Sequence, residues 1–275
     1  MLSILMGTFN GAKYLKEQIE SIISQTYKDW ILYIRDDGST DLTMNILEEY
    51  ERNYSNIKIV RDISYQNGAK YNFMHLLRLV QSDYYMFCDQ DDIWLPDKIA
   101  LSMELMHGLE GYNNSIPILI HTDMKIVDSN LIVLSESLYK TMRIKPHIVD
   151  SFNFMGVCSC GPGCTMLFND KAKKVSLKYD SYDEIPMHDW WVAINTVKYG
   201  KVAFLPIPTI LYRQHDNNTV GASDVNTYYV WEKIKGLQKT VSEHKKEFLW
   251  LKKVGYGGPV KFYFYKILYS IIRFL

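Results

Sequence analysis

The first hundred residues alternate between two hydrophobic periods. Short apolar runs, typical of strands, alternate with segments in which apolar side chains recur every three or four residues, as on one face of a helix. The strand-like runs are Leu2–Met6, Trp30–Ile34, Ile57–Val60 and Tyr84–Cys88. The helical spacing falls between them, at residues 15–23, 42–50 and 73–80. This alternation of strands and helices predicts βαβ units, and therefore an α/β fold with a mostly parallel, Rossmann-like sheet.

Beyond about residue 115 the pattern is looser. Further strands are expected at residues 116–121, 131–134, 202–205 and 209–212, and one more after the turn at residues 161–163. A helix is expected to begin at Met187, with Asp189 near its first turn, and a polar loop follows Tyr212. We expect one body over residues 1–222, with halves 1–110 and 111–222, and a helical C-terminal tail over residues 223–275.

Three of the predicted strands end in polar clusters. These clusters are Thr8–Gly11, Asp36–Ser39 and Asp89–Asp92. In open parallel sheets, ligands bind beyond the carboxyl ends of the strands, so we expect all three clusters along one edge. The glycine fingerprint of dinucleotide-binding folds is absent after the first strand, and no P-loop sequence occurs. A nucleotide at this edge would therefore be held by carboxylates and a metal ion.

The third cluster carries the most chemistry, because Asp89, Asp91 and Asp92 follow directly on the apolar run that ends at Cys88. Like charges at this spacing repel, and each carboxylate costs desolvation energy when it is enclosed. A hard divalent cation with oxygen ligands, Mn²⁺ or Mg²⁺, is the natural partner of such a group. The alternative interpretation is a solvated acidic turn with no ligand.

Composition adds a charge asymmetry. The 275 residues carry 31 basic and 31 acidic side chains, but the segment 231–275 has ten Lys or Arg and three Asp or Glu, so the tail is basic and the body acidic. Met1 leads straight into an apolar run, and the four cysteines are typical of reduced thiols, so we expect a cytoplasmic protein with no signal peptide. A zinc site at Cys158, Cys160 and Cys164 is an alternative, although paired Cys-x₂-Cys spacing is absent.

The last segment, residues 262–275, is almost wholly apolar or aromatic. It is shorter than the roughly 20 residues that a membrane-spanning helix needs. Aromatic side chains beside Lys261, Lys266 and Arg273 are typical of the membrane interface. We therefore expect peripheral contact with the inner face of the cytoplasmic membrane. The alternative is that the segment packs on the body or on a second subunit, as in a homodimer.

The motifs, in their order along the chain, resemble those of a known family. The matching pieces are Thr8-Phe-Asn-Gly, Ser24-Gln-Thr, Asp36-Asp-Gly-Ser-Thr-Asp, Asn67-Gly, Asp89-Gln-Asp-Asp-Ile-Trp-Leu-Pro-Asp-Lys, His188-Asp-Trp and Tyr212-Arg-Gln-His. Over residues 1–222 the chain resembles inverting GT-A glycosyltransferases of family 2, in the bacterial rhamnosyltransferase-like branch. The resemblance implies a GT-A fold. It also implies transfer of a sugar, with rhamnose as a candidate, from a dTDP- or UDP-sugar to a growing cell-surface glycan or lipid-linked acceptor. We expect no nucleic-acid partner.

The resemblance also implies a role for individual residues. The nucleotide-binding residues would be Thr8, Asn10, Asp37, Asn67 and Asp89. Asp37 would accept a hydrogen bond from the pyrimidine N3–H. The metal ligands, for Mn²⁺ or Mg²⁺, would be Asp91, Asp89 and His215, and the catalytic base would be Asp189. The chain departs from the family at His188, because an acidic residue is commoner before the base.

The same chemistry follows from the residues alone. Displacing a nucleoside diphosphate from a sugar needs a cation for the leaving group and a base for the acceptor hydroxyl, and Asp189 could be that base. Asp189 could instead cap its helix, and His215 could be an ordinary loop histidine. Two other functions stay open: a non-catalytic nucleotide-sugar-binding protein and an Asp-nucleophile phosphatase. A phosphatase would carry its nucleophile on the first strand and Thr or Val where Ile93 stands.

Overall fold

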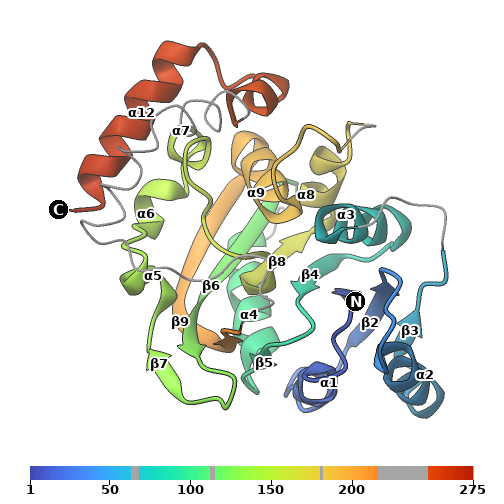
Figure 1. The fold of residues 1–275 in the computed structure, drawn as a ribbon. Helices are drawn as coiled ribbons and strands as arrows, with labels where there is room; N and C mark the ends of the chain where they lie inside the picture. Colours follow the sequence, from blue (N-terminus) through green and yellow to red (C-terminus); the bar gives the residue numbers. More distant parts are fainter. Residues whose placement is uncertain (63–67, 112–114, 180–181, 216–246, 275) are drawn as a thin grey trace.

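The protein is described here by a computed structural model that covers residues 1–62, 68–111, 115–179, 182–215 and 247–274. Its first half contains four parallel strands, as the hydrophobic pattern predicts. They are β1 (Leu2–Thr8), β2 (Trp30–Asp36), β3 (Ile57–Ile59) and β4 (Tyr84–Cys88), with β1 lying between β2 and β4. Figure 1 shows the helices between them: α1 (Leu15–Ile23), α2 (Thr43–Asn53) and α3 (Ala69–Leu79).

The helices lie on both faces of this sheet, and the strands are therefore apolar on both sides. In β1, Leu2 and Ile4 belong to the same core as Ile19 of α1. Leu5, which points to the other face, packs in a second core with Phe73 of α3. Strands buried on both faces read as continuous apolar runs, and this is why the sequence pattern located them well.

The second half extends the same sheet. The strand order in the described part is β3-β2-β1-β4-β8-β6-β9-β5, with β7 paired to β6. The added strands are β5 (Ile93–Trp94), β6 (Ile118–Val127), β7 (Val133–Ser135), β8 (Met166–Asn169) and β9 (Lys201–Arg213). Strand β8 runs antiparallel to β4 and β6, whereas β6 and β9 are parallel. The predicted α/β fold with a mostly parallel sheet is confirmed.

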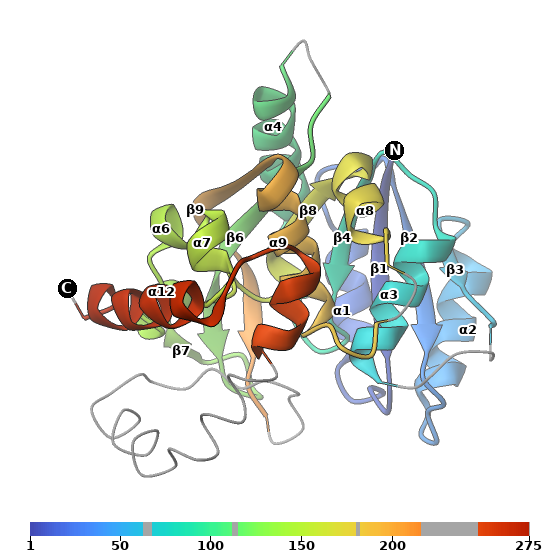
Figure 2. The ribbon, with the colours of Figure 1, turned by 90° about the horizontal axis from the view of Figure 1, so that it is seen from above.

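Helices of very different length surround this half, as the view from above in Figure 2 shows. They are α4 (Lys98–Glu110), α5 (Leu138–Thr141), α6 (Pro146–Val149), α7 (Phe152–Met155), the 3₁₀ turn η1 (Gly163–Thr165), α8 (Asp170–Ser176), α9 (His188–Tyr199) and α12 (Pro259–Ile272). The expected helix near Met187 is α9, which begins at His188.

Strand β9 differs from the expectation of two separate strands. It runs unbroken from Lys201 to Arg213 through Pro206 and Pro208. A proline cannot donate a ladder hydrogen bond, so an uninterrupted strand is not expected there. The register with β6 shifts at Thr122 and Asp123, where β9 passes its prolines, and this irregularity lets the strand continue.

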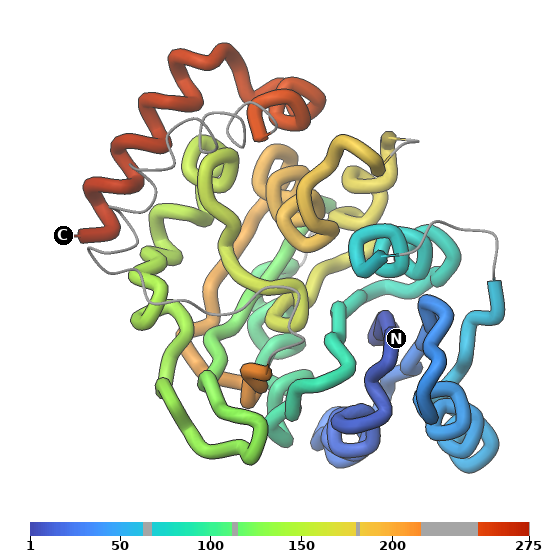
Figure 3. The backbone as a smooth tube through the Cα atoms, viewed as in Figure 1, coloured from blue at the N-terminus to red at the C-terminus, as the bar shows by residue number. Residues whose placement is uncertain are grey.

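The C-terminal tail packs on the body with one face. Trp250, Phe262 and Tyr269 are buried in the same core as Trp191 of α9. The tube in Figure 3 shows the red C-terminal segment lying beside the segment that carries α5, α6 and α7. The alternative that the tail packs on the body is therefore right for this face, whereas a homodimer stays a prediction. Among the residues that the structure describes, no helix has the length and apolar character needed to cross a bilayer.

Candidate active site

A cavity of about 800 Å³ opens at the carboxyl ends of β1 and β4. Thr8, Asp37, Asp89 and Asp91 line it from the strand ends, and Asp189 lines it from α9. The first two polar clusters also contact each other, since the Thr8 hydroxyl donates to Asp36 Oδ1 at 2.8 Å. The expectation that these clusters share one edge of the sheet is confirmed.

The predicted nucleotide-binding residues do not all face this cavity. Thr8 and Asp37 line it, and both are buried. Asp37 accepts hydrogen bonds from Arg35 Nη1 at 2.8 Å and from the Gly68 backbone N–H at 2.5 Å, which fixes the orientation of its carboxylate. Asn10 is not among the lining residues; it is exposed, and its side-chain oxygen accepts a hydrogen bond from the Thr40 backbone N–H at 2.8 Å. Asn67 lies outside the described residues.

Gln90 joins two of the clusters, a role that the sequence analysis missed. Its Oε1 accepts from the Phe9 backbone N–H at 2.9 Å, and its Nε2 donates to the Phe9 carbonyl at 3.0 Å. A Cβ at Gly11 would lie 2.2 Å from Gln90 Oε1, so a side chain there would displace Gln90 from its hydrogen bonds to Phe9. Phe9 also lines the cavity while its side chain is 56% exposed, which makes its ring available to a ligand.

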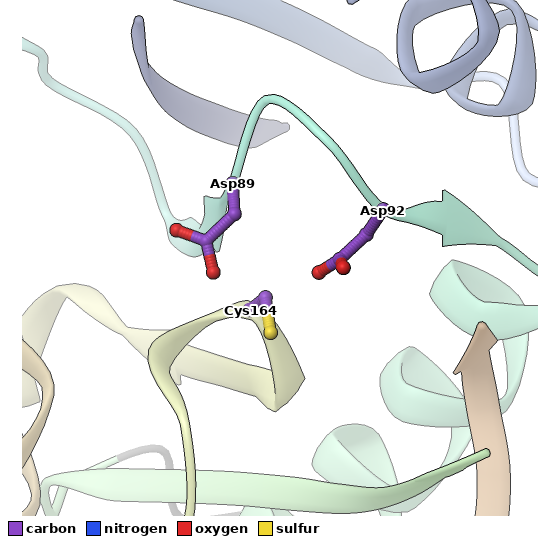
Figure 4. A group of neighbouring side chains, drawn as sticks. All are labelled: Asp89, Asp92 and Cys164. Atoms are coloured by element: carbon purple, nitrogen blue, oxygen red, sulfur yellow. The ribbon is translucent and has the colours of Figure 1, made fainter. Parts of the chain in front are cut away.

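The acidic loop after β4 is not a solvated turn. Asp92 is fully buried, its Oδ1 accepts from the Arg213 backbone N–H at 3.1 Å, and its Oδ2 has no hydrogen-bond partner among the described residues. Figure 4 shows Asp89, Asp92 and Cys164 pointing toward a common centre, with their ligand atoms within 4.8 Å of one another. Cys164 comes from η1, far away in the sequence, and no motif indicated that it would join this group.

The electrostatics of this cluster favour the binding of a cation. Burial, together with the charges of Asp91 and Asp189, raises the pKa of Asp89 to about 7. Burial, followed by the charges of Asp89 and Asp91, also raises the pKa of Asp92. The buried Lys98 ammonium lies nearby, but one cation does not balance the carboxylates of Asp89, Asp91 and Asp92. Burial also lowers the pKa of Lys98 to about 8.

The donor set fits a hard divalent cation. Carboxylate oxygens and imidazole are ligands that Mn²⁺ accepts, and carboxylates also suit Mg²⁺. Cys164 is a poor ligand for such an ion, because a thiol sulfur is a soft ligand that hard cations disfavour. The described residues contain one group of three clustered side chains able to hold a metal, and Cys158 and Cys160 do not belong to it. The structure therefore gives no support to the zinc alternative.

Asp91 and His215 meet although they are 124 residues apart. Asp91 Oδ2 lies 2.9 Å from His215 Nε2, and both side chains are largely buried. The His215 ring stacks on Tyr14 with centroids 5.0 Å apart. Close to them, Arg213 Nε donates to the Asp91 carbonyl at 2.9 Å. The end of β9 thus holds the acidic loop in place, and His215 is not an isolated loop histidine.

Asp189 projects from the first turn of α9. Its Oδ2 accepts from the Gly163 backbone N–H at 3.0 Å, and its Oδ1 accepts from the Trp190 N–H at 2.6 Å. The N-cap position of α9 is Met187, so the alternative that Asp189 is the N-cap is wrong. The carboxylate is held at the cavity wall by these two hydrogen bonds.

His188, immediately before Asp189, is a buried neutral imidazole. Its ring stacks on Phe73 with centroids 4.1 Å apart, and burial lowers its pKa to about 4. A Cβ at Gly163 would lie 3.0 Å from His188 Nε2, so these two segments approach closely. The departure from the family pattern at this position therefore replaces an acidic side chain with an uncharged one beside Asp189.

Known proteins of similar sequence and fold agree with this site. Residues 3–173 match the family described as Glycosyl transferase family 2. The dTDP-rhamnosyl transferase RfbG of Shigella flexneri is 34% identical over 229 residues, which are 79% of this chain and 74% of RfbG.

Two solved structures share the fold at low sequence identity. TarS 1–349 of S. aureus, solved in complex with UDP, has a TM-score of 0.58 and 17% identity over 78% of this chain, which spans 60% of TarS 1–349. The mannosyltransferase PcManGT of Pyrobaculum calidifontis, in complex with GDP-Man and Mn²⁺, has a TM-score of 0.60 and 14% identity, and the match covers 98% of this chain and 69% of PcManGT. The predicted family is thus confirmed: the chain belongs to glycosyl transferase family 2, a family of glycosyltransferases with the GT-A fold seen here.

Proposed function

We propose that this protein is a metal-dependent, inverting glycosyltransferase whose donor is a nucleotide sugar. The observation that carries the proposal is that one cavity gathers carboxylates from three separate elements. Asp37 follows β2, Asp89 and Asp91 follow β4, and Asp189 lies on α9. Carboxylates in separate positions can serve separate steps, because one set can hold a cation while another accepts a proton.

In this proposal the strand-end residues hold the donor. Asp91, Asp89 and His215 bind Mn²⁺ or Mg²⁺, which when bound would stabilise negative charge on the departing diphosphate. Thr8, Asn10, Asp37 and Asn67 contact the nucleotide. Asp37 is already oriented by Arg35 and Gly68. Two observations support the metal. Asp91 lies 2.9 Å from His215, and Asp89 belongs to the group of clustered side chains that could hold an ion, although Asp91 and His215 lie outside that group.

The acceptor is activated from the α9 side of the cavity. Asp189 takes the proton of the acceptor hydroxyl, which then attacks the anomeric carbon as the nucleoside diphosphate leaves. One displacement of this kind inverts the configuration at that carbon. His188, beside Asp189, is uncharged at neutral pH, because burial lowers its pKa to about 4.

The relatives support a choice of substrates to test. RfbG is named a dTDP-rhamnosyl transferase, and TarS was solved with UDP and with UDP-GlcNAc. We therefore propose a dTDP- or UDP-sugar donor, with rhamnose as the first sugar to test, and a cell-surface glycan or lipid-linked acceptor. A lipid-linked acceptor requires contact with a membrane, which we place at the C-terminal tail on the cytoplasmic side.

A thermal-shift screen of nucleotide sugars tests the donor assignment. The full chain would be heated with dTDP-rhamnose, UDP-sugars and GDP-mannose, each with Mn²⁺, with Mg²⁺ or with EDTA. A ligand that binds only the folded state raises the midpoint as its concentration exceeds Kd. We expect a rise with a pyrimidine nucleotide sugar that EDTA abolishes. A rise that is insensitive to EDTA would contradict metal dependence.

Turnover separates the remaining functions. A transferase releases the nucleoside diphosphate from its donor, whereas a binding protein would show the thermal shift without any release. Nothing in the site supports a phosphatase, because β1 (Leu2–Thr8) contains no aspartate. Hydrolysis of nitrophenyl phosphate should accordingly be absent.

A further inference from the structure

The outward face of α12 carries a row of apolar side chains. Their spacing of four, three, four and three residues places them on one side of the helix and its continuation. They are 45% to 84% exposed and are Val260, Phe264, Ile267, Ile271 and Phe274, called here the apolar ridge. The opposite side of α12 is buried through Phe262 and Tyr269.

Two cations, Lys266 of α12 and Arg273 directly after it, do not belong to this ridge. Lys266 pairs with Glu247 at 2.8 Å, and Arg273 donates to the Met142 carbonyl, so both point toward the body. The ridge is therefore apolar along its length. No described segment of the chain covers it, because its side chains keep about half or more of their surface exposed.

A second cavity, of about 680 Å³, opens beside the C-terminal end of the ridge. Four cationic side chains line it: Lys140, Arg143, Lys145 and Arg273. None of them has an ion-pair partner among the described residues. The Arg143 guanidinium lies over the ring of Phe274, 5.2 Å from its centroid, and so connects this basic cavity to the ridge.

The acidic residues of the basic cavity are already engaged. Glu136 pairs with Lys125 at 2.7 Å. Asp123 is buried and accepts a hydrogen bond from the Ser137 hydroxyl at 2.5 Å. The four cations outnumber the two carboxylates that line the cavity, so its net charge is positive. The ligand that fits this charge is an anion.

We propose that the ridge and the basic cavity form one docking surface for an anionic phospholipid bilayer. The apolar side chains enter the interface, and the cavity receives a lipid phosphate. Apolar burial together with attraction between basic residues and acidic lipids is the physical basis of interfacial binding. A second copy of the chain docking through the same surface would bring two sets of four cations toward each other, which disfavours a dimer here.

The docking surface adjoins the candidate active site. The segment 138–146 lies between the two cavities: Leu138 and Met142 line the first, Lys140 and Lys145 line the second, and Ile144 lines both. A docked bilayer would therefore lie next to one wall of the active site, where a lipid-linked acceptor could enter. This last link rests on the proposed function, whereas the docking itself does not.

Vesicle flotation of the full chain tests the proposal. Vesicles of phosphatidylcholine alone would be compared with vesicles that also contain phosphatidylglycerol, with and without excess inorganic phosphate. Lys140→Gln with Lys145→Gln removes two cavity charges, and Lys58→Gln with Lys171→Gln removes two exposed charges elsewhere. Phe264→Ser with Ile267→Ser removes two ridge side chains, and Leu42→Ser with Leu79→Ser is the matched control.

We expect the unmodified chain to float with phosphatidylglycerol vesicles and far less with phosphatidylcholine alone. Each lost cavity charge should lower the partition about fivefold. The ridge pair should lower it on both kinds of vesicle, and both control pairs should leave it unchanged. Excess inorganic phosphate should weaken the unmodified chain more than the cavity variant, because free phosphate competes for the same site.

Three outcomes would overturn the proposal: no flotation, flotation that the cavity variant retains in full, or a dimer in sedimentation that the ridge variant converts to monomer. The last result would assign the ridge to a second copy. None of the substituted residues lines the candidate active site, so nucleotide-sugar thermal shifts should stay unchanged in every variant. Loss of flotation with donor binding intact thus separates this proposal from the proposed transferase function.

Discussion

At the scale of single residues, Asp37 has a structural task besides the proposed contact with the base. It forms an ion pair with Arg35 in which both side chains are less than a tenth exposed. Removing one partner of a buried pair leaves the other charge uncompensated, which costs about 3–5 kcal/mol. Asp37→Ala should therefore lower the free energy of unfolding by that amount, as measured by urea denaturation.

A double variant gives the control for Asp37. Adding Arg35→Met to Asp37→Ala removes both charges and should recover most of the lost stability. If the single and double variants are equally unstable, the ion pair is not the cause. Donor binding should stay weak in the double variant, because the carboxylate proposed to bind the base is absent in both.

His188 should make the protein sensitive to acid. Burial lowers its folded-state pKa to about 4 from the ordinary value of 6.5, so below pH 6.5 the unfolded chain binds more protons than the folded one. Stability is then lost as the pH falls from 6.5 toward 4, by at most about 1.4 kcal/mol per pH unit. Between pH 7.5 and pH 5, His188 should account for up to about 2 kcal/mol of the lost stability.

The measurement compares unfolding free energies at pH 7.5 and pH 5 in His188→Gln and in His107→Gln. His107 is exposed, and His107→Gln serves as the control for replacing a histidine by glutamine. His188→Gln should flatten the dependence. An unchanged slope in His188→Gln would mean that the imidazole is protonated as easily in the folded protein as in the unfolded chain.

At the scale of elements, the C-terminal end of β9 positions the acidic loop. Arg213 Nε donates to the Asp91 carbonyl, and Nη1 donates to the Ser129 carbonyl, each at 2.9 Å. Arg213→Lys keeps the charge but cannot make both hydrogen bonds. We expect the affinity for Mn²⁺, read from donor thermal shifts, to fall by about 10- to 100-fold, as for other residues that orient metal ligands.

Arg61→Lys is the matched control, because Arg61 forms an exposed pair with Glu51. It should leave the Mn²⁺ dependence unchanged. Equal effects of the two substitutions on Mn²⁺ dependence would show that Arg213 acts only through general stability.

The sequence located elements where local chemistry decides them and missed contacts that arise from packing. The strands β1 to β4 are buried on both faces, so their apolar runs predicted them, as well as the shared edge where they end. Strand β9 was divided in two, because Pro206 and Pro208 read as breaks while the compensating register shift in β6 leaves no local signal.

The candidate site likewise combines contacts that the sequence predicted with contacts that arise only from packing. The motif order predicted that Asp91 and His215 belong together, and the structure places them 2.9 Å apart. Cys164 near Asp89 and Asp92, by contrast, results from how η1 folds against β4. The hydrogen bond between the Asn10 side chain and the Thr40 backbone likewise joins two loops and is visible only in the folded chain, whereas the role of Asn10 at the nucleotide stays a prediction.

At the scale of the whole molecule, we propose that the cavity has two functional sides. The strand ends hold the metal and the donor, and α9 carries the group that accepts the proton. This division predicts opposite behaviour for two substitutions that each replace a carboxylate by an amide. Asp91→Asn should lose metal-dependent donor binding, because an amide is a much weaker ligand for a hard cation. Asp189→Asn should bind donor normally and lose transfer, since its role is confined to the reacting complex.

The most direct test measures donor binding and sugar transfer side by side in these two variants. The account predicts that Asp189→Asn keeps the donor thermal shift with Mn²⁺, while its transfer rate falls by about 10²- to 10⁴-fold, the usual contribution of a general base. Asp91→Asn should lose the metal-dependent part of the shift and the transfer together. Normal transfer by Asp189→Asn, or an unchanged metal-dependent shift in Asp91→Asn, would contradict the division of the cavity proposed here.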